Sequence, residues 1–326
     1  MLRIHFTAED LGRVRLSDPD PLWETVLTLF RFRWPTAPLV FGSWRQQALR
    51  RAPRSTREFL MPLTPGGYYP DFLTPCESSK GLEAGIDAIL STATARLREE
   101  IALLPAAGGL PREIELLARG DLDAVRHLGM ALEAQHRTAV APFWDLVRVH
   151  VDADRAIRSR ALLRGGCERL LESFRPMMRW QYPVLEVDFP VEQDLYLEGR
   201  GLRLVPAFFS WGEPDALHDP ELPPVLVYPV AHDLRLSGGV GPRSTEGLEA
   251  LIGATRAWVL ESIGDGCTTS ELAARVGVAA SSISQHTAVL RDGGLVSTVR
   301  AGQSVLHTVT PLGRSLLAGE DTVALT

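Results

Sequence analysis

The clearest pattern of apolar and polar positions lies near the end of the chain. Leu272, Ala273 and Val276 recur at helical spacing. Thr268 and Glu271 precede this stripe as a capping box, in which the hydroxyl and the carboxylate each satisfy a free backbone amide. The pattern therefore predicts a helix of about two turns that begins at Thr268.

A second helix is predicted directly after a turn. Gly277 is the residue type that accepts a left-handed conformation, so it is expected to end the first helix. The next helix is expected over 280–292, with Ile283, Val289 and Leu290 facing inward. Polar residues gather near its N-terminal end on the opposite side: Ser281, Ser282, Ser284 and Gln285.

A hairpin and a short helix are expected to follow. Gly293–Gly294 stops the second helix, and the alternation over 295–300 and 304–309 predicts two paired strands. Thr310–Pro311 is an N-cap followed by a first-turn proline, which predicts a last helix over 312–318.

This order of elements is typical of a module that reads DNA. In a helix-turn-helix, the second helix enters the major groove with its N-terminal residues against base edges, and a Gln amide pairs with adenine. Long side chains at a hairpin tip reach phosphates or the adjacent minor groove. The predicted DNA contacts are Thr269, Ser281, Ser282, Ser284, Gln285, Arg291, Arg300 and Gln303.

The run SSISQHTAVLRDGGLV resembles the ArsR-type winged helix-turn-helix regulators of bacteria, notably at Ser284, His286, Leu290 and Gly294–Val296. The resemblance covers 248–317. It implies a homodimer whose two recognition helices occupy successive half-sites of a palindromic operator in double-stranded DNA.

Three positions depart from that family. Thr287 stands where the family has Leu, and Ala279–Ala280 stands where a hydroxyl cap is usual. The metal-sensing members carry a cysteine pair in the first motif helix, whereas here Cys267 stands alone before it. A thiolate metal site needs several ligands at fixed spacing, so we expect no metal and no cofactor.

Two interpretations of His286 stay open, a core histidine and a base contact. The charge balance also does not decide whether this region binds DNA, because the sequence from residue 244 onward contains five arginines and eight acidic residues. Arg275, Arg291 and Arg300 nevertheless fall on the motif itself.

The sequence of region 1–236 contains no motif of comparable specificity. We expect this region to sense a small molecule or to form the dimer. Helical spacing predicts an amphipathic helix over 20–32, a basic helix over 43–51 that is either a solvated face or a phosphate contact, and a bundle up to residue 180. Helices are predicted at 89–104, 112–119, 121–140, 142–163 and 167–174. Its histidines have no metal-ligand spacing.

Strand patterns are expected in 181–236, at 184–189, 194–199, 202–209 and 224–230. They predict a small antiparallel sheet with a hairpin turn at Glu198–Gly201. The loop 61–75 is rich in proline, glycine and aromatic residues. Ligand contacts and core packing are both open for its aromatic residues and for one tryptophan of the strand region: Tyr68, Tyr69, Phe72 and Trp211.

The fold class is accordingly predicted as α+β and mostly helical, with an N-terminal domain over 1–236, a glycine-rich linker over 237–245, a winged helix-turn-helix over 246–318 and a tail over 319–326. The chain has 326 residues, 45% hydrophobic and 23% charged, with a formal charge of -6. These values favour a soluble protein and exclude a general polyanion binder.

No signal peptide and no membrane span are expected, so we expect a cytoplasmic protein without a membrane partner. Cys76, Cys167 and Cys267 are too few and too far apart to predict a disulfide framework.

The sequence thus predicts a DNA-binding regulator, expected to act as a repressor and controlled by a small-molecule effector of the N-terminal domain. The alternatives are an enzyme, or a protein-interaction protein in which the winged helix serves dimerisation. No nucleophile array, phosphate loop or metal motif supports an enzyme.

Overall fold

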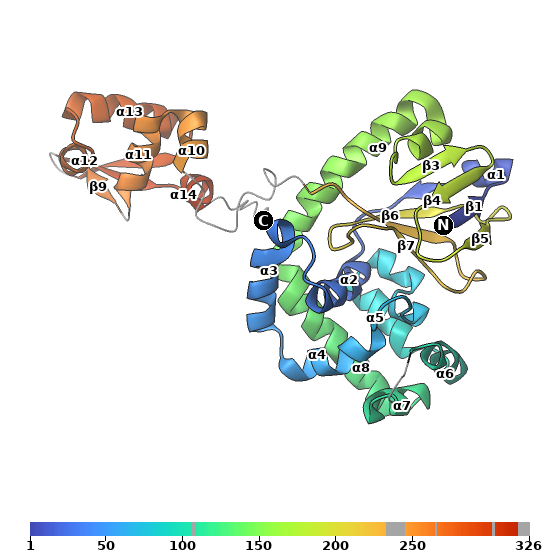
Figure 1. Ribbon diagram of the computed structural model, residues 1–326. Coiled ribbons are helices and arrows are strands. Elements are labelled where there is room, and N and C mark those ends of the chain that lie inside the picture. Colours follow the sequence, from blue (N-terminus) through green and yellow to red (C-terminus); the bar gives the residue numbers. More distant parts are fainter. Residues whose placement is uncertain (106–108, 233–244, 265, 302–303, 319–326) are drawn as a thin grey trace. The chain divides into compact units, whose positions relative to one another are not determined.

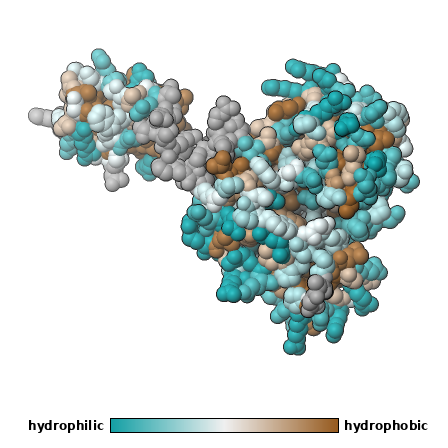
Figure 2. All heavy atoms as spheres, in the orientation of Figure 1, coloured by the Kyte–Doolittle hydropathy of each residue, from teal (hydrophilic) through white to brown (hydrophobic). Residues whose placement is uncertain are grey.

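The computed structural model describes residues 1–105, 109–232, 245–264, 266–301 and 304–318 (Figure 1). The chain divides into two compact units, Met1–Ser237 (unit 1) and Gly238–Thr326 (unit 2). The molecule is an α+β protein with several small sheets. Hydrophilic residues cover much of the visible face of each unit, and apolar residues are dispersed among them (Figure 2).

Unit 1 gathers its strands at one end and helices α4 to α8 at the other, with α2 between them (Figure 1). Its helices are α1 (Ala8–Leu11), α2 (Pro21–Arg33), α3 (Pro38–Arg51), α4 (Arg54–Leu60), α5 (Leu82–Leu90), α6 (Thr94–Ala102), α7 (Arg112–Ala118), α8 (Leu122–Gln135) and α9 (Trp144–Glu172). A kink at Gly165–Gly166 divides α9, as the separate predicted helices at 142–163 and 167–174 imply. Short helical turns lie at Met61–Leu63, Asp71–Leu73, Cys76–Lys80, His136–Val140 and Ala141–Phe143.

The described strands of unit 1 form two mixed sheets of four strands each. The first has the order β3-β4-β1-β5 and the second the order β2-β6-β8-β7. The strands are β1 (Leu2–His5), β2 (Arg15–Leu16), β3 (Met178–Gln181), β4 (Val184–Val187), β5 (Gln193–Tyr196), β6 (Arg203–Ala207), β7 (Asp215–Ala216) and β8 (Val225–Pro229).

The prediction of one small antiparallel sheet is therefore wrong. β1 pairs in parallel with β5, and β6 pairs in parallel with both β2 and β8. The first sixteen residues supply β1 and β2, so the boundary between a helical part up to 180 and a strand-rich part after it is wrong as well. The predicted hairpin at Glu198–Gly201 is also wrong, because it joins β5 of one sheet to β6 of the other.

Helix α2 is central rather than amphipathic. Trp23 and Leu27 belong to the core that covers the sheets, whereas Leu22, Val26 and Leu29 belong to a second core among the helices. A helix that separates two cores is buried all round. The predicted helix over 89–104 also divides, because α5 ends at Leu90 and α6 starts at Thr94.

Unit 2 has its own core, built around Leu260, Leu272, Ile283 and Leu290. Its elements are α10 (Thr245–Ile252), α11 (Ala254–Ile263), β9 (Cys267–Thr268), α12 (Thr269–Val276), α13 (Ala280–Asp292), β10 (Val296–Ala301), β11 (Ser304–Val309) and α14 (Pro311–Ala318). The strands form an antiparallel sheet of order β10-β11-β9. The predicted tail lies outside the described residues, as does the linker except for Thr245, which begins α10.

Candidate nucleic-acid interface

The two motif helices begin and end where the caps predict. The hydroxyl of Thr268 accepts from the Glu271 amide at 3.3 Å, and the Thr268 amide donates to the Glu271 carboxylate at 2.8 Å. Gly277 ends α12 at a φ of 73°, in the left-handed region. The capping box, the turn and the bounds of α13 are confirmed.

The buried stripe of α13 differs by one position from the prediction. Ile283, Thr287 and Leu290 are buried, while Val289 is 51% exposed. A helix advances about 100° per residue, so a stripe that contains Thr287 leaves Val289 on the flank. The Thr287 hydroxyl is satisfied within the helix, because it donates to the Ile283 carbonyl at 2.9 Å. His286 is half-buried.

The polar residues of α13 fall into two groups. Ser281 and Gln285 are exposed, one helical turn apart on the same face, and their side chains have no hydrogen-bond partner among the described residues. Ser282 is half-buried. Ser284 is exposed, but its hydroxyl donates to the Ala280 carbonyl at 3.0 Å. Ser281 and Gln285 are thus the side chains of this group that are free to bind a partner.

Thr269 has an intramolecular partner that the sequence did not reveal. Its hydroxyl lies 2.9 Å from Nε2 of His307, and the Thr298 hydroxyl lies 3.1 Å from Nδ1 of the same ring. Burial lowers the pKa of His307, and the charge of Arg291 adds to this effect. A neutral imidazole therefore links the first turn of α12 to the hairpin. The alternation in β11 places His307 on the same buried face as Val309, and this pattern could have indicated the contact from the sequence.

The motif arginines differ in their surroundings. Arg300 on β10 is exposed and has no ion-pair or hydrogen-bond partner in the part of unit 2 that the structure describes. Arg291 pairs with the adjacent Asp292 at 3.2 Å. Arg275 donates to the Ser262 carbonyl of α11 at 3.0 Å. Gln303 lies outside the described residues.

The four aromatic residues of unit 1 that were candidates for ligand contacts also differ in their surroundings. Tyr69 and Trp211 line one cavity together. The Tyr68 hydroxyl donates to the Glu100 carbonyl at 3.1 Å, and Phe72 is buried in the helical core. The sequence did not single out Arg31 and Asp215, which line the same cavity from α2 and β7.

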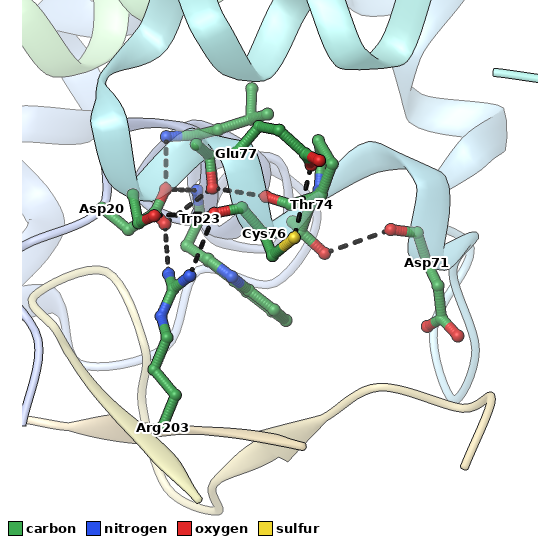
Figure 3. Close-up of polar contacts among 11 residues, drawn as sticks. Asp20, Trp23, Asp71, Thr74, Cys76, Glu77 and Arg203 are labelled. Carbon is green, nitrogen blue, oxygen red and sulfur yellow. Dashed lines mark hydrogen bonds and ion pairs between the residues drawn. The ribbon is translucent and has the colours of Figure 1, made fainter. Parts of the chain in front are cut away.

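A buried polar cluster near the start of α2 is structural. Asp20 accepts from Ser78 at 2.7 Å and from Arg203 at 2.5 Å, and it also caps α2 (Figure 3). Burial, followed by the neighbouring Glu77, raises the pKa of the Cys76 thiol, so this thiol stays protonated. The cluster joins α2 to β6 through the contact of Asp20 with Arg203. Beside it, the exposed Cys76 thiol donates to the Glu77 carboxylate at 3.4 Å.

Among the described residues no group of three or more His, Cys, Asp or Glu side chains is arranged to hold a metal ion. No described helix has the length and apolar character needed to cross a bilayer. Comparisons with protein-family models, curated proteins and solved structures found no match for this chain.

Proposed function

We propose that unit 2 is a winged helix-turn-helix and that the protein is a sequence-specific DNA-binding regulator that acts as a homodimeric repressor. Helix α13 is the recognition helix, and the hairpin of β10 and β11 is the wing. The order of α12, a three-residue turn, α13 and the hairpin supports this assignment. So does the resemblance of residues 281–296 to ArsR-type regulators.

The observation that carries the proposal is the exposed, unpartnered pair Ser281 and Gln285 near the start of α13. A Gln amide offers a donor and an acceptor that match the edge of adenine in the major groove. A small hydroxyl one turn earlier allows close approach to the bases. Arg300 supplies a cation from the hairpin for a phosphate or for the adjacent minor groove.

Helix α13 also begins without a side-chain cap, at Ala279. The backbone amides of Ala280 and Ser281 have no acceptor among the described residues, so they can donate to a phosphate of the DNA backbone, which the helix dipole favours. Because unit 2 carries more acidic than basic residues, the attraction to DNA has to come from this face.

The test is selection of duplexes from a random pool by the full-length protein, followed by fluorescence anisotropy on the enriched sequence and on DNA upstream of its own coding region. We expect a palindromic sequence whose half-sites lie about 34–36 Å apart, one helical turn. Affinity should fall steeply as salt rises. Absence of any sequence preference at moderate salt would contradict the proposal.

One observation favours a second candidate, a protein-interaction module. Val289 on α13 and Val299 on β10 are 51% and 59% exposed, beside the proposed DNA contacts. Exposed apolar side chains of this size suit a protein partner. Joint replacement of Ser281, Gln285 and Arg300 by alanine distinguishes the two, because it abolishes DNA regulation and leaves a contact made through the valines intact.

A further inference from the structure

Unit 1 contains a cavity of about 410 Å³ between α2, the segment around Gly66 and the segment that leads into β7. The residues that give it its chemistry are Phe30, Arg31, Trp34, Tyr69, Trp211 and Asp215. This volume lies within the range of small-molecule binding sites, about 300–1,000 Å³.

The walls of the cavity are aromatic. The rings of Phe30 and Trp34 stack with centroids 5.8 Å apart, and Tyr69 meets Phe30 edge to face at 5.3 Å. Trp34 and Trp211 are 40% and 41% exposed, so two large rings present faces that a ligand can cover. Gly66 allows this arrangement, since a Cβ there would meet the Trp34 ring at 2.5 Å.

Three polar groups at the cavity lack a hydrogen-bond partner among the described residues. The Tyr69 hydroxyl and the Arg31 Nε–H are buried and unsatisfied. The Asp215 carboxyl also accepts no hydrogen bond from a described residue. Buried polar groups are nearly always paired, so the two buried groups without a partner, Tyr69 and Arg31, indicate that a bound molecule supplies the partners.

The protonation state of each group determines whether it donates or accepts a hydrogen bond. Burial raises the pKa of Tyr69 well above its usual value, so the phenol remains a donor at neutral pH. Burial raises the pKa of Asp215 to about 6, although the Arg31 charge opposes this, so the carboxyl is mostly ionised at pH 7 and accepts. Two donors and one acceptor therefore line the cavity.

Charge narrows the class of ligand further. Asp215 and Glu213 line the cavity against the single guanidinium of Arg31. An anionic ligand would meet two carboxylates and is disfavoured, whereas a cation is attracted both to them and to the aromatic faces.

We propose that this cavity binds a flat, ring-containing molecule, neutral or singly positive, whose N–H or O–H group donates to Asp215 while its rings stack between Trp34 and Trp211. The Tyr69 hydroxyl and the Arg31 Nε–H then donate to an acceptor atom of the ligand or to a water that the ligand retains in the cavity. The proposal concerns ligand binding to unit 1, so it stands whether or not unit 2 binds DNA.

The test uses three indole probes that differ in charge, tryptamine, indole-3-ethanol and indole-3-propionate, with the full-length protein at pH 7. Binding is measured by ligand-observed saturation-transfer NMR and by calorimetry. Tryptamine and indole-3-ethanol should bind, and indole-3-propionate should bind at least tenfold more weakly. Equal affinity for all three overturns the assigned class, and no binding of any probe overturns the site.

Variants locate the binding. Trp211→Ala should weaken tryptamine and indole-3-ethanol at least fivefold, because a stacking face is lost. Asp215→Asn should weaken tryptamine about tenfold and indole-3-ethanol less than threefold. The matched control is Trp258→Ala, at a tryptophan that is 52% exposed on α11 of unit 2, and it should change neither affinity. Unchanged binding by Trp211→Ala protein with wild-type thermal stability would overturn the proposal.

Discussion

Buried carboxylates from the N-terminal helices hold the chain on both sides of strand β6. Glu24 accepts from the amides of Phe208 and Phe209 at 2.7 and 2.9 Å, just after β6. Asp10 accepts from the Gly201 amide at 2.8 Å, just before it. Because unpaired buried amides are costly, single acidic side chains determine the path of this segment and of the cavity wall that follows it.

Replacement of Glu24 tests this role. In Glu24→Gln the side-chain amide would face one of the two backbone N–H groups, and one buried donor would lose its acceptor. We expect a loss of about 1–3 kcal/mol in the free energy of unfolding of unit 1. Chemical denaturation followed by tryptophan fluorescence measures it. The exposed Glu83→Gln is the control and should stay within about 0.5 kcal/mol of wild type.

Glu24 also predicts a pH dependence. Burial raises its pKa to about 8, although the two amides oppose the shift. A carboxyl whose pKa is higher in the folded than in the unfolded state stabilises the fold fully at low pH. This contribution is lost as pH rises from about 4.5 towards 8. The difference in unfolding free energy between wild type and Glu24→Gln should therefore shrink from pH 5 to pH 8. A difference that grows over this range would contradict the protonated state.

The proposed DNA contacts give two predictions, one for a base contact and one for a phosphate contact. Gln285→Ala should cost about 1–3 kcal/mol at one base position and relax sequence preference there. Arg300→Ala should weaken binding to all sequences alike and lower the slope of log affinity against log salt by about one. Anisotropy titrations measure both. Gln46→Ala on α3 and Arg98→Ala on α6, two exposed positions of unit 1, are the matched controls.

At the scale of elements, local signals predicted unit 2 well. Thr268, Gly277 and Pro311 mark helix boundaries through their own chemistry, and the structure has those boundaries. The resemblance to a regulator family and the DNA contacts stay predictions, because a structure of the protein without DNA does not show which residues bind it.

Unit 1 was predicted less completely for a physical reason. β1 and β2 are short, and their partners lie almost two hundred residues further along the chain, so no local pattern predicts the pairing. Of the residues that line the cavity, the sequence singled out only the aromatic residues Tyr69 and Trp211. Arg31 and Asp215 come from distant elements, and their meeting depends on the tertiary fold.

The capping box gives a prediction for a single element. Thr268→Ala removes the acceptor of the Glu271 amide and should destabilise α12 by about 1 kcal/mol. Hydrogen exchange of peptides that cover 262–276 in the full-length protein should accelerate about fivefold. Ser270→Ala, exposed on the same helix, is the control and should exchange at the wild-type rate.

At the scale of the whole molecule, the cavity and the proposed DNA face belong to different units. Trp211 of the cavity wall contacts His232, with ring centroids 5.2 Å apart, and His232 is the last described residue before segment 233–244. A ligand that covers Trp211 therefore lies beside His232, the last residue of unit 1 that the structure describes.

This arrangement predicts that ligand and DNA are coupled. Saturating tryptamine should change the DNA affinity of the full-length protein at least threefold, because a ligand that prefers one conformation shifts the population towards it. The affinity of residues 244–326 alone should not respond. If the truncated chain binds DNA as tightly as the full-length protein and tryptamine alters neither, unit 1 is not a sensor.

Strand β1 lies inside its sheet, between β4 and β5, and those partners lie at residues 184–196. On a translating ribosome, β1 is made before these partners and waits unpaired until they have left the exit tunnel. This sheet of unit 1 therefore closes only after the segment 184–196 has emerged, whereas unit 2, whose contacts are local in sequence, can fold as soon as it emerges.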